Sequence, residues 1–217
     1  ALHKQREHMF TRAKDLADVA VVFSCKSQDR FGSDETQDDN YVAAVRGWEQ
    51  VLWENHVPFT LIPDSCLKAG ELDKYKCVVL ANTACIGDEQ ASAIRDYVNR
   101  GGSLVASYET SLYDENYQKR CDFALADVFG VSYRLTRGPL PVSYHWLRKE
   151  HPIAQTFGDT DMIANNGYVC YVHSGECGKV AATLIPEIIP QHPENAWVPE
   201  MEIDVPTIIT HEFGEGR

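Results

Sequence analysis

Residues 76–107 read KCVVLANTACIGDEQASAIRDYVNRGGSLVAS, and they decide the fold because they predict a strand, a helix and a second strand in succession. Residues 76–81 form an apolar run after Lys76, which is typical of a strand covered on both faces. Residues 88–100 open with acidic side chains, end at Gly101-Gly102 and place apolar side chains on one side: Ala91, Ile94 and Val98. Residues 103–107 then predict a further strand.

The flanking residues repeat this alternation. Residues 18–24 form a continuous apolar run, 57–62 predict another strand, and 123–129 predict a short helix ended by a glycine. Residues 41–56 predict a helix whose apolar stripe consists of Val42, Val45, Trp48, Val51 and Leu52. Short connections between strands and helices predict an α/β fold, a flavodoxin-like three-layer sandwich with a mainly parallel sheet and right-handed crossovers.

The last third has a different pattern. Residues 167–172 and 179–185 flank a turn at 174–176 and predict a C-terminal β-hairpin extension. A loop with Pro186, Pro190, Pro193 and Pro199 leads to a strand over 206–213. The closing Gly214-Glu215-Gly216-Arg217 is expected to turn into one more strand, so we expect the C-terminal strand to be truncated.

Composition narrows the class of protein. Of the 217 residues 44% are hydrophobic, and no apolar run is long enough for a transmembrane helix. The net charge of -12 argues against nucleic acid as a partner. The acidic run 34–39 lacks calcium-loop spacing and is interpreted as a solvated loop, and we expect neither a metal ion nor a cofactor.

The N-terminus and the cysteines indicate the setting. Residues 1–16 are charged, lack the features of a signal peptide and are expected to form a linker helix from a preceding domain, with the main domain over 17–217. An initial Ala suggests processing or excision from a longer chain. Seven cysteines, several in apolar runs, are expected to be reduced, which favours a cytoplasmic location.

Several motifs, in this order, carry a family resemblance. Residues 78–82, 88–90 and 98–105 are similar to the middle domain of family 42 β-galactosidases, the β-galactosidase trimerisation domain. Residues 109–115 with 123–131 resemble a related group in which this domain follows a glycoside-hydrolase barrel. Residues 212–217 look like the family's closing glycine-x-glycine-arginine hairpin.

The resemblance implies membership of the class I glutamine-amidotransferase-like superfamily, whose active members carry a cysteine nucleophile on a sharp turn after a strand. In this sequence that turn follows residues 104–107, and it holds Tyr108, Glu109, Thr110 and Ser111 in place of a cysteine. These four residues would be a vestigial elbow and a candidate ligand pocket. The implied function is a non-catalytic accessory and assembly domain of a multidomain glycoside hydrolase, packed against its barrel and against copies of itself.

Three alternatives stay open. Cys85 precedes a helix and could serve a free-standing cysteine hydrolase of the amidotransferase-like kind, although no base is identifiable for it. Glu109 could serve a carboxylate-based enzyme or a carbohydrate-binding module, or it could cap a helix beginning near Thr110 or hydrogen-bond to the loop. Asp114 and Glu115 are interpreted as exposed loop charges.

Two further groups have structural interpretations. Cys170, His173 and Cys177 offer three zinc ligands without a fourth, and strand alternation would send the first two to opposite faces, so they are interpreted as turn residues. Aromatic side chains that could stack on a sugar occur in an irregular stretch, where they more often close a core or an interface. They are Tyr133, Tyr144 and Trp146, and His145 lies beside them.

Overall fold

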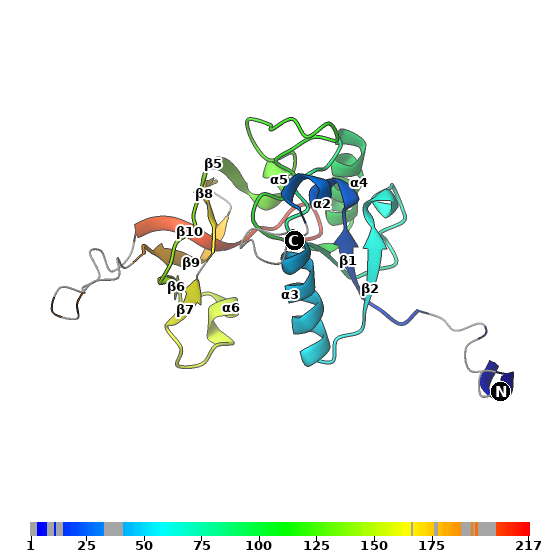
Figure 1. Ribbon diagram of the computed structural model, residues 1–217, viewed down its shortest axis with the longest axis horizontal. Coiled ribbons are helices and arrows are strands. Elements are labelled where there is room, and N and C mark those ends of the chain that lie inside the picture. The colour runs from blue at the N-terminus through cyan, green and yellow to red at the C-terminus, as the bar shows by residue number, and fades with distance from the viewer. Residues whose placement is uncertain are drawn as a thin grey trace.

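The computed structural model describes residues 4–7, 11, 15–32, 41–165, 167–175, 178–187, 192, 194 and 203–217. Within this part of the chain, no helix has the length and apolar character needed to span a membrane. Figure 1 shows helices and parallel strands gathered around β1 (Val19–Phe23) and, beside them, a second group of strands that runs from β5 (Val131–Arg137) to β10 (Ile203–Thr210). The acidic run 34–39, Cys177 and the prolines at 190, 193 and 199 lie outside the described residues.

The predicted parallel sheet is confirmed. It consists of β1 (Val19–Phe23), β2 (Phe59–Pro63), β3 (Cys77–Leu80) and β4 (Ser103–Ala106), in the order β2-β1-β3-β4. All three pairings are parallel, with Val21 of β1 opposite Val79 of β3. The first strand therefore lies inside the sheet, where its apolar side chains are covered on both faces.

Helices cover both faces of this sheet, as the alternation predicted. Ala20 and Val22 pack with α4 (Asp88–Asn99), while Val21 packs with α3 (Tyr41–Glu54) on the opposite face. The predicted stripe of α3 is only partly right, because Val51 is 50% exposed. A helix that sequence patterns missed, α2 (Cys25–Phe31), follows β1 and is capped by the hydroxyl of Ser24. A 3₁₀ turn, η1 (Asp64–Cys66), follows β2.

The remaining strands form two antiparallel sheets. One has the order β10-β9-β6-β7, from β10 (Ile203–Thr210), β9 (Lys179–Ile185), β6 (Ser143–Leu147) and β7 (Met162–Asn165). The other pairs β5 (Val131–Arg137) with β8 (Val169–Ser174). Two short helices complete the set, α5 (Ala126–Phe129) and α6 (Pro152–Gln155).

The predicted hairpin of 167–172 with 179–185 is wrong. Both strands exist, as β8 and β9, but they belong to different sheets. Val169 and Tyr171 of β8 pack on Leu184 of β9 in one apolar cluster. The two strands therefore meet through their side chains rather than through backbone hydrogen bonds, and the local sequence cannot distinguish these arrangements because both bury the same residues.

The closing residues of the chain return to the parallel sheet. The N–H of Leu104 in β4 donates to the carbonyl of Arg217 at 2.8 Å, and the N–H of Glu215 donates to the carbonyl of Asn99 at 3.0 Å. A Cβ atom at Gly216 would lie 2.2 Å from the carbonyl oxygen of Val98, so only glycine permits this approach. At the other end, residues 4–7 are helical, and the linker helix over 1–16 stays a prediction.

Candidate functional site

The turn after β4 is a strained corner at the carboxyl end of the sheet. Tyr108 and Ser111 have positive φ values of 56° and 66°, a region that residues with a side chain seldom occupy. The N–H of Ser107 donates to Leu80 at the end of β3 at 3.2 Å, and the hydroxyl of Ser107 accepts from the N–H of Asn82 at 3.1 Å. The corner thus lies beside the turn that follows β3.

No helix begins at Thr110, so the capping interpretation of Glu109 is wrong. Residues 108–111 form turns, in which the N–H of Thr110 donates to the carbonyl of Ser107 at 3.3 Å and that of Leu112 to the carbonyl of Glu109 at 3.0 Å. The Thr110 hydroxyl donates to the carbonyls of Leu80 at 3.1 Å and Ser107 at 2.7 Å. It therefore ties two strand ends together.

The carboxylate of Glu109 is hydrogen-bonded to β5, a strand outside the parallel sheet. Glu109 is 5% exposed, and its Oε1 accepts a hydrogen bond of 2.6 Å from the hydroxyl of Thr136 in β5. The hydroxyl of Tyr133 lies 3.1 Å from that of Thr136, and Lys119 Nζ donates to Tyr133 at 2.9 Å. Since Thr136 donates to Glu109, it accepts from Tyr133, so the hydrogen bonds run in one direction from an ammonium to a carboxylate.

The other two corner residues, Ser111 and Tyr108, also contact neighbouring residues. Ser111 is fully buried; its hydroxyl accepts from the N–H of Leu125 at 3.3 Å, and its own N–H donates to the carbonyl of Thr83 at 3.0 Å. The ring of Tyr108 packs edge-on against that of Tyr168, with 6.0 Å between centroids. The side chains at 109, 110 and 111 are all buried. The corner is therefore packed at 109, 110 and 111, while Tyr108 is half-buried, and the ligand pocket at these four residues stays a prediction.

Cys85 has the environment of a structural thiol. It is 1% exposed, and its backbone N–H donates to the hydroxyl of Ser27 at 3.1 Å. Burial raises the pKa of the Cys85 thiol to about 11, against weaker opposing effects of Arg30 and Ser27. A nucleophilic cysteine needs the opposite shift, because the thiolate is the reactive form. The side chain is therefore held as a neutral thiol at neutral pH.

Cys170 and His173, interpreted from the sequence as turn residues rather than zinc ligands, are the two members of their motif that lie within the described residues. Among the described residues, no group of three or more His, Cys, Asp or Glu side chains could hold a metal ion. Cys170 is half-buried beside Thr136, with 3.6 Å between Sγ and Oγ1, while His173 is exposed. Burial raises the pKa of the Cys170 thiol to about 12.

The aromatic and acidic residues named from the sequence are mostly engaged. Tyr133 makes an edge-to-face contact with Phe123, and Lys119 Nζ lies 4.7 Å from the centre of its ring. Tyr144 and Trp146 are half-buried on β6, and burial lowers the pKa of His145 between them. Glu115 is exposed as expected. Asp114, interpreted as exposed, is half-buried, and its carboxylate accepts the N–H groups of two turn residues, Asn116 and Gln118.

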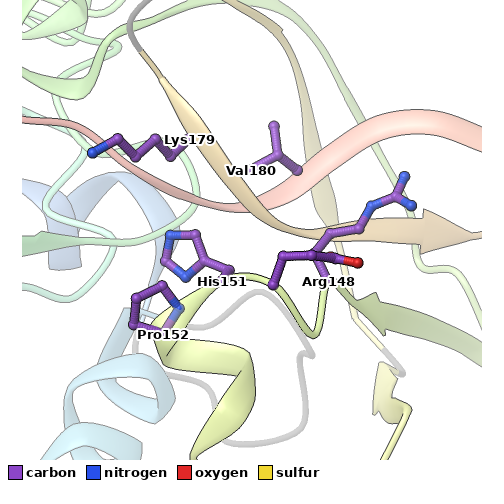
Figure 2. Close-up of a pocket in the computed structure, with 6 residues that line it drawn as sticks. Arg148, His151, Pro152, Lys179 and Val180 are labelled. Carbon is purple, nitrogen blue, oxygen red and sulfur yellow. The ribbon is translucent and has the colours of Figure 1, made fainter.

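A shallow hollow of about 370 Å³ lies between β9 and α6, lined by Arg148, Glu150, His151, Pro152, Lys179 and Val180. Figure 2 shows the charged ends of Arg148 and Lys179 pointing in different directions, and His151 lies between them. His151 lies 2.9 Å from the Thr210 hydroxyl through Nε2 and accepts from the N–H of Ile153 through Nδ1. A binding site places its polar groups so that they converge on a ligand. The polar side chains that line this hollow do not converge in this way.

Sequence reasoning located the corner but missed its partners. These partners follow Glu109 by 10 to 27 residues, and no local pattern links them to it: they are Lys119, Tyr133 and Thr136. Asn82 was also missed: it has a φ of 48°, is almost fully buried, and its Oδ1 has no hydrogen-bond partner within the described part of the chain. The sequence held one signal for Asn82, which is that a non-glycine residue stands directly after a buried strand.

One family model covers most of the chain. The family model described as the β-galactosidase trimerisation domain matches residues 17–217. The β-galactosidase BbgII of Bifidobacterium bifidum is 25% identical over 201 residues, which cover 92% of this chain and 27% of that protein. The chain thus spans little more than a quarter of the length of this relative.

Solved structures show the same fold. The β-galactosidase from Bacillus circulans sp. alkalophilus has a TM-score of 0.77 and 18% identity over 98% of this chain and 29% of its own. The β-galactosidase from Rahnella sp. R3 has a TM-score of 0.72 and 17% identity over 92% of this chain and 27% of its own. At these identities the likeness concerns the fold, and the chain corresponds to one section of each larger structure.

Proposed function

Since the chain belongs to the β-galactosidase trimerisation domain family, we propose that it is a non-catalytic assembly domain of a larger, β-galactosidase-like glycoside hydrolase. The observation that carries this proposal is the match of one family model to residues 17–217. BbgII, of which the chain covers 27%, supports a parent protein with further domains. A glycoside-hydrolase barrel ahead of this domain would supply the catalytic carboxylates.

The packed corner supports the absence of a catalytic centre in this domain. Glycoside hydrolysis requires two carboxyl groups that flank an accessible glycosidic bond. Glu109 is buried and bonded to Thr136, and Cys85 is a buried thiol whose pKa burial raises to about 11. Neither side chain can meet a substrate without a rearrangement of the packing around it.

The partners of the domain would be proteins. Copies of the chain and the barrel of the parent protein are the partners we propose, and the net charge of -12 disfavours nucleic acid. A cytoplasmic location is supported by the cysteines, because the six within the described residues are free thiols.

Two measurements on the isolated chain test this proposal. Sedimentation velocity over about 1–200 µM is expected to reveal reversible association towards a trimer, and a species that stays monomeric throughout would contradict the assembly role. Hydrolysis of a nitrophenyl β-galactoside is expected to equal that of buffer. Turnover that disappears in Glu109→Gln would identify a catalytic carboxylate and refute the proposal.

Calorimetry with galactose and lactose addresses the carbohydrate-binding alternative. We expect no heat of binding, because the side chains at 109, 110 and 111 are buried. Heat that is measured for the wild-type chain and is lost in Glu109→Ala would assign a sugar site to the corner in place of the packed junction.

A further inference from the structure

His151 ties the short helix α6 to the last strand of the antiparallel sheet. Its Nδ1 lies 3.2 Å from the backbone nitrogen of Ile153 in α6. Its Nε2 lies 2.9 Å from the hydroxyl oxygen of Thr210 in β10, which follows His151 by 59 residues. One imidazole ring therefore joins the start of a helix to a strand that is distant in the sequence.

These two contacts decide which ring nitrogen carries the proton. A backbone N–H can only donate, so the Nδ1 that receives the N–H of Ile153 has no proton of its own. A neutral imidazole then carries its proton on Nε2, which donates to the hydroxyl of Thr210. The fold thus requires His151 in the neutral state and in one of its two tautomers.

The Nδ1 contact is the cap of α6. His151 precedes the helix with extended backbone angles, φ of -83° and ψ of 133°, and Pro152 and Ile153 occupy the first two helical positions. The first N–H groups of a helix have no partner within the helix, and a proline at the first position removes one of them. The imidazole nitrogen satisfies the next N–H, as an oxygen of Ser, Asp or Asn does in most helices.

Protonation of His151 removes this cap. A second proton can only go to Nδ1, which then becomes a donor that faces the N–H donor of Ile153. The bond to Thr210 is kept, because Nε2 retains its proton. Histidine is the side chain whose charge ordinarily changes between about pH 5 and 8, so the loss of the cap falls within that range.

The charged groups around the ring come from three parts of the chain. Arg148 and Glu150 precede His151 and line the same hollow, and Lys179 comes from β9. Lys179 forms an ion pair of 3.2 Å with Glu212, which follows β10. Figure 2 shows the ring of His151 between Arg148 and Lys179, and α6 itself carries no charged side chain. All four charges stay in place in the variants used below.

We propose that His151 is a proton-operated cap, which holds the first turn of α6 on β10 while the ring is neutral and releases it when the ring is protonated. Ala154 in this turn packs in one apolar cluster with Leu147 and Ala182, and the residues before it line the hollow between α6 and β9. The uptake of a proton is thereby linked to the order of one wall of the hollow. This role is independent of the assembly proposed above, because it involves contacts within one chain.

Amide NMR spectroscopy of Ile153 tests the cap. Between about pH 8 and about pH 5 we expect its chemical shift to follow a titration in the wild-type chain. Its protection against hydrogen exchange, corrected for the intrinsic rate at each pH, is expected to fall about 5-fold, the contribution of one helix cap. His151→Asn keeps a capping oxygen and cannot titrate, so both quantities should be constant in this variant.

His173→Asn is the matched control. His173 is exposed on β8, which belongs to a different sheet, so this variant should show the same response of Ile153 as the wild-type chain. Two-bond proton–nitrogen correlation spectra of the histidine rings measure the tautomer directly. At about pH 8 we expect His151 to carry its proton on Nε2, and a proton on Nδ1 would overturn the assignment.

Thr210→Val is an independent variant, because valine keeps the shape of threonine and removes the acceptor of Nε2. We expect lower protection of Ile153 already at about pH 8, and unchanged protection would refute the link between α6 and β10. An amide of Ile153 that does not respond to pH in the wild-type chain refutes the cap. An equal response in His151→Asn also refutes it, since another group would then be titrating.

Discussion

Replacing Thr136 by valine tests whether the corner after β4 is a structural junction. Valine has nearly the shape of threonine, so the change removes a hydroxyl with little effect on packing. Glu109, which is 5% exposed, then loses the donor that lies 2.6 Å from its Oε1, and Tyr133 loses its acceptor at 3.1 Å. A hydrogen bond to a charged group contributes about 1.5–3 kcal/mol net, so we expect the free energy of unfolding to fall by about 2 kcal/mol.

Urea unfolding followed by tryptophan fluorescence measures this loss. With a slope of about 2 kcal/mol per molar urea, the midpoint should fall by about 1 M while the slope is unchanged. Thr136→Ser is the matched control, because it keeps the hydroxyl and removes one methyl group, which costs less than about 1 kcal/mol at a half-buried position. A double-mutant cycle with Glu109→Gln should give a coupling energy of about 1–2 kcal/mol between the two side chains.

The reasoning is refuted by a specific pattern of midpoints. If Thr136→Val costs no more than Thr136→Ser, and the Glu109→Gln effect simply adds to it, Thr136 does not hold the carboxylate. The stability of the junction would then not depend on the hydrogen bond between Thr136 and Glu109.

Two further predictions concern Cys85 and the glycines. Burial raises the pKa of Cys85 to about 11 from an ordinary 9.0, so its thiolate fraction at pH 8 is lowered about 100-fold. Mass spectrometry after treatment with iodoacetamide should therefore find the label first on the exposed Cys25 and Cys121. Early labelling of Cys85 would contradict its structural role. Gly216→Ala places a Cβ 2.2 Å from the Val98 carbonyl oxygen and should lower the free energy of unfolding by about 2–3 kcal/mol. Gly47→Ala in α3 is the comparison, because no atom lies within 4 Å of the new Cβ. This second change should raise the free energy of unfolding by up to about 1 kcal/mol. Thermal unfolding compares the two, and equal melting temperatures would disprove the close approach of the chain's end to α4.

Local patterns were sufficient for the parallel sheet. β1, β3 and β4 are short apolar runs, and α4 carries acidic residues at its start and glycines after its end, so each element is encoded within its own residues. Short connections then fix parallel pairing, because a strand, a helix and the next strand can pack only with a right-handed crossover. The corner was found in the same way, as the turn after the fourth strand.

The short helix α2 was missed because its own residues carry little of the information that forms it. Its residues, Cys25–Phe31, are mostly polar, and only Ser27 among them is buried. The hydroxyl of Ser24 caps this helix, and that of Ser27 accepts from the N–H of Cys85, which lies 58 residues further along the chain. A helix held by such distant contacts leaves a weak periodic signal in its own sequence.

The sequence by itself determined the types and order of the elements in the parallel sheet, the family resemblance, and the absence of a cysteine at the corner. Only the tertiary structure decided that β8 pairs with β5 and β9 with β6 and β10, that Thr136 holds Glu109, and that Trp53 is left in water. The physical reason is the distance along the chain over which each kind of interaction acts. Backbone propensity and periodicity act over a few residues, whereas sheet partners, buried hydrogen bonds and exposed faces depend on which distant segments come together.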